Sequence, residues 1–136
     1  MLVFISHGGQ DTWVARQIER EVRAAGAETF LDEANVEIHE AFPNVIRDYL
    51  NRSDELVVLL TPWSLQRPWV WIEVGAAFQR SISIVGILHG MSREDLHSNA
   101  SIPVILLERN LVQLNDVDRY FTQLRDRITG GVEGQG

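Results

Sequence analysis

Short runs of aliphatic and β-branched residues alternate along the chain with longer amphipathic segments. Five of these runs have the length of strands and show little internal alternation, which is typical of a parallel sheet covered on both faces. We predict strands at Leu2–Ser6, Ala27–Leu31, Glu55–Thr61, Ile82–Leu88 and Ile102–Leu107.

Apolar side chains recur at helical spacing between the predicted strands. The first helix begins at Asp11 or Thr12, since either residue suits the N-cap position, and it ends before Gly26. Further helices are predicted at about 40–52, 68–80 and 115–128, with one or two helical turns in the polar stretch 91–100.

Strand and helix alternate through the whole chain, which defines an α/β fold class. With right-handed crossovers we predict a flavodoxin-like, doubly wound sandwich with a five-stranded parallel sheet in the order 2-1-3-4-5. The first and third strands then flank the topological switch point, where ligands bind beyond the carboxyl ends of the strands. The two loops at that point are Ser6–Gln10 and Thr61–Pro68. We expect one domain over residues 1–129, followed by a disordered, glycine-rich tail at 130–136.

Composition narrows the range of partners. The 136 residues carry a formal net charge of −7, and the 12 basic residues are all arginines that form no run, which argues against a nucleic-acid binder. The chain has no cysteine, in agreement with a reducing cytoplasm, and its longest apolar runs are strand-sized. We therefore expect a cytoplasmic protein that binds neither nucleic acid nor a membrane.

Several chemistries common on this architecture lack their motifs here. The chain has no GxGxxG fingerprint, no P-loop and no GxSxG elbow. A phosphoacceptor receiver needs an aspartate at the end of the third strand, where this chain has Thr61. The four histidines show no ligand spacing, so no metal site and no cofactor are predicted.

A single carboxylate, Glu73, lies in the otherwise apolar, tryptophan-rich segment 61–77. Trp69 and Glu73 are four residues apart and therefore share one helical face. Because burying an unpaired carboxylate is costly, Glu73 should be paired, neutralised by a raised pKa, or directed into a cleft. An ion pair with Arg67 or Arg80 is the structural alternative to a functional role.

Three segments resemble the sequence boxes of the Toll/interleukin-1 receptor (TIR) domain family. Val3–His7, followed by Gln10–Asp11, resembles the first box, and Phe30–Asp32 with Ile38 resembles the second. The run Ser64–Glu73 resembles the segment that carries the catalytic glutamate in the enzymatic members. The resemblance covers about the whole chain, including the expected domain at 1–129.

The chain departs from the family pattern at three places. His39–Glu40 stands where the family usually has a glycine after the isoleucine, and Gly8–Gly9 stands where enzymatic members often have a basic residue. The third box is only faintly echoed, by Tyr120–Phe121. These departures bear most on how a phosphate would be recognised.

The resemblance implies cleavage of NAD+ between nicotinamide and ribose, by hydrolysis or by cyclisation to a cyclic ADP-ribose-type signal, as in bacterial antiviral defence. NAD+ is then a substrate rather than a cofactor, and Glu73 is the catalytic residue. Self-association through TIR–TIR contacts, and a sensor or effector protein as partner, are also implied. Two other functions remain open, namely a non-catalytic TIR interaction module and another N-ribosyl transferase.

The expected substrate-binding residues come from the loops around the switch point. They are Ser6, His7, Gly8, Gly9, Phe30, Asp32, Trp63, Arg67 and Trp69. Backbone amides near the first helix suit phosphate, and Trp69 is placed to pack on a substrate ring. Each also has a structural alternative: Phe30 as core, Asp32 as a turn cap, the glycines as a tight turn, and Arg67 as the partner of Glu73.

Overall fold

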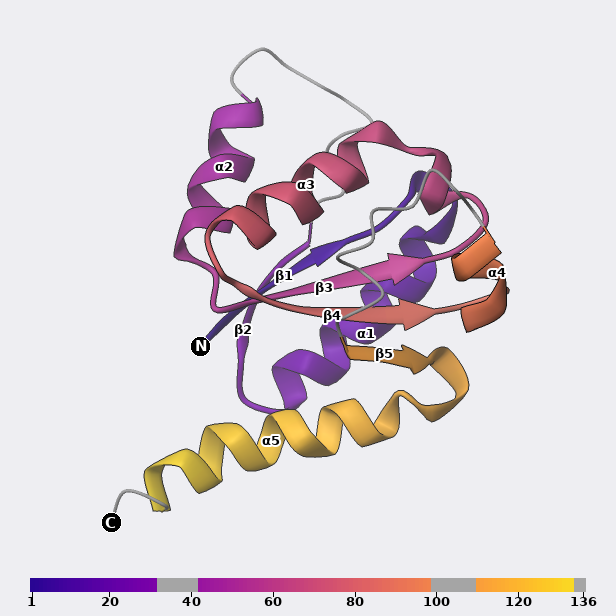
Figure 1. The fold of residues 1–136 in the computed structure, drawn as a ribbon. Coiled ribbons are helices and arrows are strands. Elements are labelled where there is room, and N and C mark those ends of the chain that lie inside the picture. The colour runs from indigo at the N-terminus through magenta and orange to yellow at the C-terminus, as the bar shows by residue number, and fades with distance from the viewer. Residues whose placement is uncertain (32–41, 99–109, 134–136) are drawn as a thin grey trace.

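The structure, a computed structural model, describes residues 1–31, 42–98 and 110–133. Its strands form one parallel sheet in the order β2-β1-β3-β4-β5, which confirms the predicted α/β class and strand order (Figure 1). The strands are β1 (Leu2–Ser6), β2 (Glu28–Leu31), β3 (Glu55–Leu60), β4 (Ser83–Leu88) and β5 (Asn110–Gln113).

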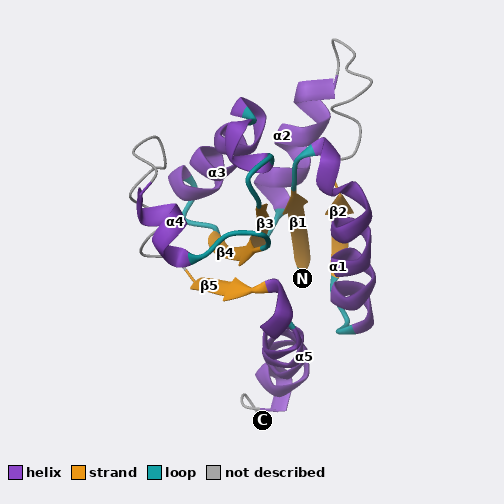
Figure 2. Ribbon diagram, turned by 90° about the vertical axis from the view of Figure 1, so that its right-hand side faces the viewer, coloured by secondary structure: helices purple, strands orange, loops and turns teal. Residues whose placement is uncertain are grey.

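Helices cover both faces of the sheet, with α1 and α5 on one side and α2, α3 and α4 on the other (Figure 2). The α-helices are α1 (Thr12–Ala24), α2 (Phe42–Arg52), α3 (Pro68–Gln79), α4 (Arg93–Ser98) and α5 (Asp118–Glu133). Short 3-10 turns precede three of them, η1 (Gly9–Asp11), η3 (Ser64–Gln66) and η5 (Leu114–Asp116).

The core consists of two apolar clusters separated by the sheet. Alternate residues of one strand feed the two clusters, so that Val3 and Ile5 face α1 and α5 while Phe4 faces α2 and α3. Every residue of β3 is buried, as expected for the central strand of a parallel sheet. This explains why the strand runs show so little alternation in the sequence.

Gly26 ends the first helix as predicted. Its φ of 108° lies in the left-handed region that favours glycine, and its amide donates to the carbonyl of Arg23. A Cβ at this position would lie 3.4 Å from the side chain of Ile128, so α5 packs closely over the turn. The turn thereby directs the chain from α1 into β2.

The C-terminal strand and helix were not predicted at their observed bounds. The fifth strand of the described sheet is Asn110–Gln113, and the strand predicted at 102–107 lies outside the described residues. The helix α5 continues to Glu133, beyond the boundary predicted at 129, because each added residue gains an i→i−4 bond even through Gly130. Of the predicted tail, residues 134–136 lie outside the described part.

Within the described ranges, no helix is both long and apolar enough to cross a membrane.

Candidate functional site

The switch point brings Ser6 and Glu73 together. Ser6 is the last residue of β1, and Glu73 lies in the middle of α3, the helix that follows β3. The Ser6 hydroxyl donates to Glu73 Oε1 over 2.6 Å, with exposed fractions of 0% and 2% for the two residues. A hydrogen bond to a charged group contributes about 1.5–3 kcal/mol, so this contact fixes the carboxylate at the carboxyl edge of the sheet.

The ion pair considered as an alternative role for Glu73 does not form. Among the described residues, neither Arg67 nor Arg80 pairs with the carboxylate. Arg67 instead lies over the glycine turn after β1, where Cβ atoms built on Gly8 and Gly9 would come within 3.4 Å of its Cδ and 3.2 Å of its Nη1, respectively. The structure therefore groups Arg67 with the two glycines.

Asp11 is the N-cap residue of α1, one of the two predicted, but its side chain has a different partner. Its side chain makes no cap hydrogen bond, and its carboxylate is buried and accepts from the Thr61 hydroxyl over 2.6 Å. Thr61 Oγ1 also accepts from the Ser64 amide at 3.0 Å, while Ser64 Oγ accepts from the Thr61 amide at 2.9 Å. These bonds join the loop after β1 to the loop after β3.

Gly8 belongs to the same junction. A Cβ at Gly8 would lie 3.1 Å from the Cα of Ser64, which is too close for backbone to accommodate easily. The glycine therefore suits a close approach of the two loops, whereas its φ of −84° is one that any residue adopts, so the tight turn considered from the sequence does not require it. Gly9, one residue later, is exposed and begins the 3-10 turn η1.

His7 is buried beside the junction, with 2% of its surface exposed. Its Nδ1 lies 2.7 Å from the carbonyl oxygen of Gly8. Because a carbonyl only accepts, Nδ1 carries the proton of this bond. In the described part of the chain, Nε2 has no hydrogen-bond partner.

The aromatic residues predicted for the site are only partly brought to it. Phe30 stacks on Tyr49 with ring centroids 4.1 Å apart and packs at 5.1 Å from Phe4, so it contributes to the apolar cluster beneath α2 and α3. Trp69 is half-buried against the same cluster, and Trp63 is 49% exposed on the loop before α3. Asp32 lies outside the described residues.

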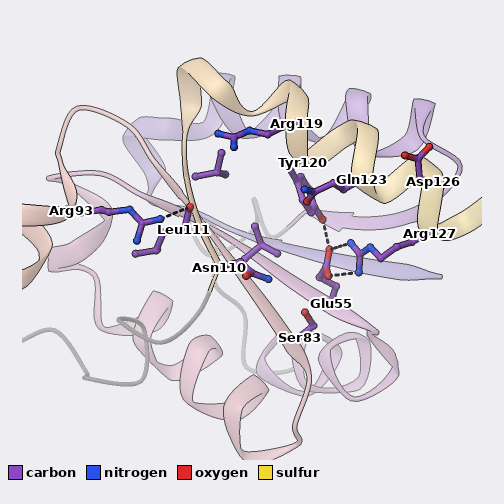
Figure 3. A pocket seen from close by; sticks show the side chains of 12 residues that line it. Glu55, Ser83, Arg93, Asn110, Leu111, Arg119, Tyr120, Gln123, Asp126 and Arg127 are labelled. Atoms are coloured by element: carbon purple, nitrogen blue, oxygen red, sulfur yellow. Dashed lines mark hydrogen bonds and ion pairs between the residues drawn. The ribbon is translucent and has the colours of Figure 1, made fainter.

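A second buried glutamate lies at the opposite, amino edge of the sheet. Glu55, the first residue of β3, is 1% exposed and accepts from the Tyr120 hydroxyl and from both terminal nitrogens of Arg127, at 3.0 and 3.1 Å. Burial, followed by the charge of Glu55, raises the pKa of Tyr120 well above its usual value. The hydrogen bond to Glu55 likewise raises the pKa of Arg127. We call Glu55, Tyr120 and Arg127 the amino-edge cluster (Figure 3).

Sequence reasoning missed both the loop junction and the amino-edge cluster. Thr61 and Ser64, three residues apart after a strand, carry the signature of a hydroxyl-bonded turn. Tyr120 and Arg127, seven residues apart, share one face of a helix, and Glu55 opens an otherwise apolar strand. These sequence patterns indicate that the side chains form hydrogen bonds, but they do not indicate which residues they bond to.

No group of three or more potential metal ligands occurs among the described residues. The site is thus a carboxylate and a serine at the switch point of an α/β sandwich, with a glycine turn and an arginine beside them. This arrangement defines an α/β domain whose ligand-binding position is the carboxyl edge of β1 and β3.

Residues 3–128 match the family model for the TIR domain. The chain therefore belongs to the TIR domain family, which confirms the resemblance seen in the sequence, and as such it is a signalling module. No curated protein matches the chain.

Two solved structures share its fold. A metazoan TIR-STING receptor from C. gigas, in complex with 2',3'-cGAMP, is similar with a TM-score of 0.66 and 23% identity, over 90% of this chain and 38% of that chain. The TIR domain of the Toll-related receptor TRR-2 from Hydra magnipapillata is similar with a TM-score of 0.63 and 19% identity, over 90% of this chain and 97% of that chain. This chain thus spans 38% of the length of the TIR-STING receptor.

Proposed function

We propose that the chain is an NAD+ nucleosidase that cleaves the bond between nicotinamide and ribose, with Glu73 as the catalytic carboxylate. The observation that carries the proposal is the position of Glu73, which is buried at the switch point and held by Ser6 at 2.6 Å. A carboxylate oriented in a water-poor site is suited to stabilise a developing positive charge.

The chemistry needs only one carboxylate. Nicotinamide leaves a pyridinium as a neutral base, so no acid has to protonate it, unlike the alkoxide leaving group of an ordinary glycosidase. The C–N bond breaks with its electron pair moving to the ring nitrogen, and the ribosyl cation is trapped by water, which loses a proton, or by a nucleophile within ADP-ribose. Glu73 stabilises the oxocarbenium-like transition state by its charge.

Arg67 and the glycine turn supply the complementary half of the site. The turn leads into the amino end of α1, where backbone amides and the helix dipole favour an anion. Arg67 lies over this turn rather than on Glu73, so its guanidinium is available for a phosphate of the substrate. Ser6 and His7 border the reacting sugar in this arrangement, and Trp69 packs on a ring.

Burial of Glu73 points to control by assembly. With 2% of its surface exposed, the residue contacts substrate only after the switch point opens. We propose that TIR–TIR self-association, or a sensor or effector partner, stabilises the open arrangement by binding it preferentially. The expected product is ADP-ribose or a cyclic form of it.

A second candidate function is a non-catalytic interaction module. It is favoured by the closed carboxylate and by an apolar outer surface of α3, where Ile72 is 55% exposed. In this case the Ser6–Glu73 bond serves only to attach α3 to the sheet.

Nicotinamide release from NAD+ separates the two candidates. The protein is incubated at high concentration, with its assembly state recorded, and products are resolved by chromatography. Glu73→Gln keeps the side-chain shape and an acceptor for Ser6, so it should fold and lose about 10²–10³-fold in rate, in the range found for removing one electrostatic stabiliser. Glu21→Gln, at an exposed glutamate on α1, is the matched control and should release nicotinamide at the wild-type rate.

Three results would contradict the proposal. Inert wild-type protein in every assembled form favours the interaction module. Equal activity of wild type and Glu73→Gln removes Glu73 from the mechanism. Transfer of the ribosyl group to an added base, in place of water or ADP-ribose, identifies an N-ribosyl transferase.

A further inference from the structure

Among the residues that the structure describes, the sheet face beneath α5 is partly open at its β4–β5 edge. A cavity of about 710 Å³ lies there, and its floor is formed by Ser83 and Val85 of β4 and by Asn110 and Val112 of β5 (Figure 3). A parallel sheet is normally covered on both faces, so an open volume above two of its strands is unusual. The volume lies within the range of small-molecule sites. We call this cavity the α5 slot.

The wall of the α5 slot is polar where a helix on a sheet is normally apolar. Arg119, Gln123 and Arg127 recur at four-residue intervals along α5 and line the slot, whereas Phe121 and Leu124 of the same helix enter the core. The slot therefore combines two valines of the sheet, Val85 and Val112, with amide and guanidinium groups, as ligand sites combine apolar and polar groups.

Positive charge gathers at one end of the slot. Arg93 of α4 reaches across and donates to the carbonyl of Leu111 over 2.8 Å, which fixes its guanidinium and leaves further N–H groups for other acceptors. Figure 3 shows Arg93 and Arg119 toward one end and the Glu55–Arg127 pair toward the other, with Asn110 between them. Arg119 has no hydrogen bond or ion pair within the described part of the chain.

The charges of the lining are unbalanced. Three arginines meet two carboxylates, Glu55 and Asp126, and Glu55 is already paired with Arg127. The chain has a net charge of −7, so its surface repels anions on average. A local excess of guanidinium groups therefore marks a place where an anion can bind. Arginine suits phosphate in particular, because its planar fork donates two parallel hydrogen bonds.

We propose that the α5 slot binds a phosphorylated small molecule of nucleotide size. Arg93 and Arg119 hold the phosphate, while the amides of Asn110 and Gln123 bond a polar heterocycle that packs on Val85 and Val112. The slot lies on the opposite face of the sheet from α3, so this ligand and a substrate at Glu73 occupy separate sites. The proposal does not depend on NAD+ cleavage.

Binding of AMP to the full chain tests the proposal, with inorganic phosphate and adenosine as the two partial ligands. Affinities are measured by titration calorimetry, and contacts by chemical-shift changes of the backbone amides. AMP should bind more tightly than either partial ligand. Arg119→Gln and Arg93→Gln should each weaken it about tenfold, as expected for a lost charge-assisted bond. Arg125→Gln, on α5 but outside the lining, is the matched control and should leave the affinity unchanged.

A second comparison separates the slot from the switch point. Asn110 and Gln123 should show AMP-induced shift changes, and Arg67→Gln should leave these changes in place, because Arg67 does not line the slot. Loss of binding in Arg67→Gln with retention in Arg119→Gln places AMP at the glycine turn and overturns the proposal. The proposal is also overturned if AMP does not bind, if its affinity is the same in both slot-arginine variants as in the wild type, or if phosphate binds as tightly as AMP. Thermal unfolding of each variant checks that it is folded.

Discussion

The two edges of the sheet each bury a glutamate, but they satisfy it differently. Glu55 at the amino edge receives a phenol and a bidentate guanidinium, whereas Glu73 at the carboxyl edge receives a serine hydroxyl and no bond from Arg67 or Arg80. A charge matched by an opposite charge attaches elements to each other and has little left to offer a ligand. A hydroxyl donor orients a carboxylate without cancelling its charge, and an oriented carboxylate is what stabilisation of a cation requires.

The largest expected effect tests this difference through stability. Glu55→Gln should lower the free energy of unfolding by about 3 kcal/mol, since it weakens the charge-assisted bonds that the buried carboxylate accepts from Tyr120 and Arg127. Glu73→Gln should change it by less than about 1 kcal/mol, because the amide oxygen still accepts from Ser6. Urea unfolding monitored by circular dichroism gives both values, with Glu28→Gln at the exposed start of β2 as control. An equal or larger loss in Glu73→Gln would make both glutamates structural clamps.

The junction of the two loops should come next in magnitude. Thr61→Val keeps the side-chain shape but leaves the carboxylate of Asp11 without the hydroxyl and the Ser64 amide without its acceptor. We expect a loss of about 2 kcal/mol in unfolding free energy. Thr122→Val, at an exposed position of α5, controls for the change of residue type. Similar unfolding curves for the two variants would mean that the junction does not hold the loops.

Alanine substitutions at two glycines should change stability by smaller amounts and in opposite directions, because only one of the two glycines has close neighbours. Gly8→Ala should cost about 1.5 kcal/mol, because the new methyl meets the backbone of Ser64 at 3.1 Å. Gly75→Ala, in α3, should stabilise by up to about 1 kcal/mol, since nothing lies within 4 Å and alanine favours the helix. Thermal unfolding reports both shifts, and the same sign for both would contradict the close approach at Gly8.

Loss of the Tyr120 hydroxyl should have the smallest effect on stability at neutral pH, and its contribution should change with pH in alkali. Tyr120→Phe should cost about 1 kcal/mol near pH 7. Because the folded pKa of Tyr120 is raised, the unfolded chain loses the phenolic proton above about pH 10 while the folded chain keeps it. Unfolding then releases a proton, and stability falls as pH rises, by about 1.4 kcal/mol per pH unit at most.

Urea unfolding between pH 9 and pH 11 measures this slope. Tyr120→Phe should remove it, and Tyr49→Phe, at the other tyrosine, controls for loss of a phenol. A slope that persists in Tyr120→Phe would assign the alkaline loss to other groups.

Local patterns predicted the elements well wherever the signal was continuous. The aliphatic run at Leu2–Ser6 was predicted at its observed bounds, because a buried parallel strand has apolar side chains on both faces. The edge strand Asn110–Gln113 was not, since it has only two apolar residues, flanked by polar ones, and follows a more apolar run at 102–107. Edge strands are short and half-exposed, so the β-propensity of their residues is a weak guide to their position.

The site was predictable only as far as topology allowed. Strand order placed Ser6 and the segment of Glu73 at the same edge of the sheet, and the structure joins them. The bond between Asp11 and Thr61, 50 positions apart, could not be predicted in the same way. Such pairs depend on side-chain direction and register, which no local window contains.

The chain segment between Ser6 and Glu73 overlaps the segment between Glu55 and Tyr120, and this affects the order in which the two contacts form during synthesis. Ser6 and Glu73 are 67 positions apart, and Glu55 and Tyr120 are 65 apart, so closing either loop costs a similar entropy. The order in which the two contacts form is then set by the direction of synthesis, since β1, β3 and α3 leave the ribosome well before α5. A nascent chain can form the serine contact first and add the phenol and guanidinium last, so α5 completes an intermediate whose switch point has already formed.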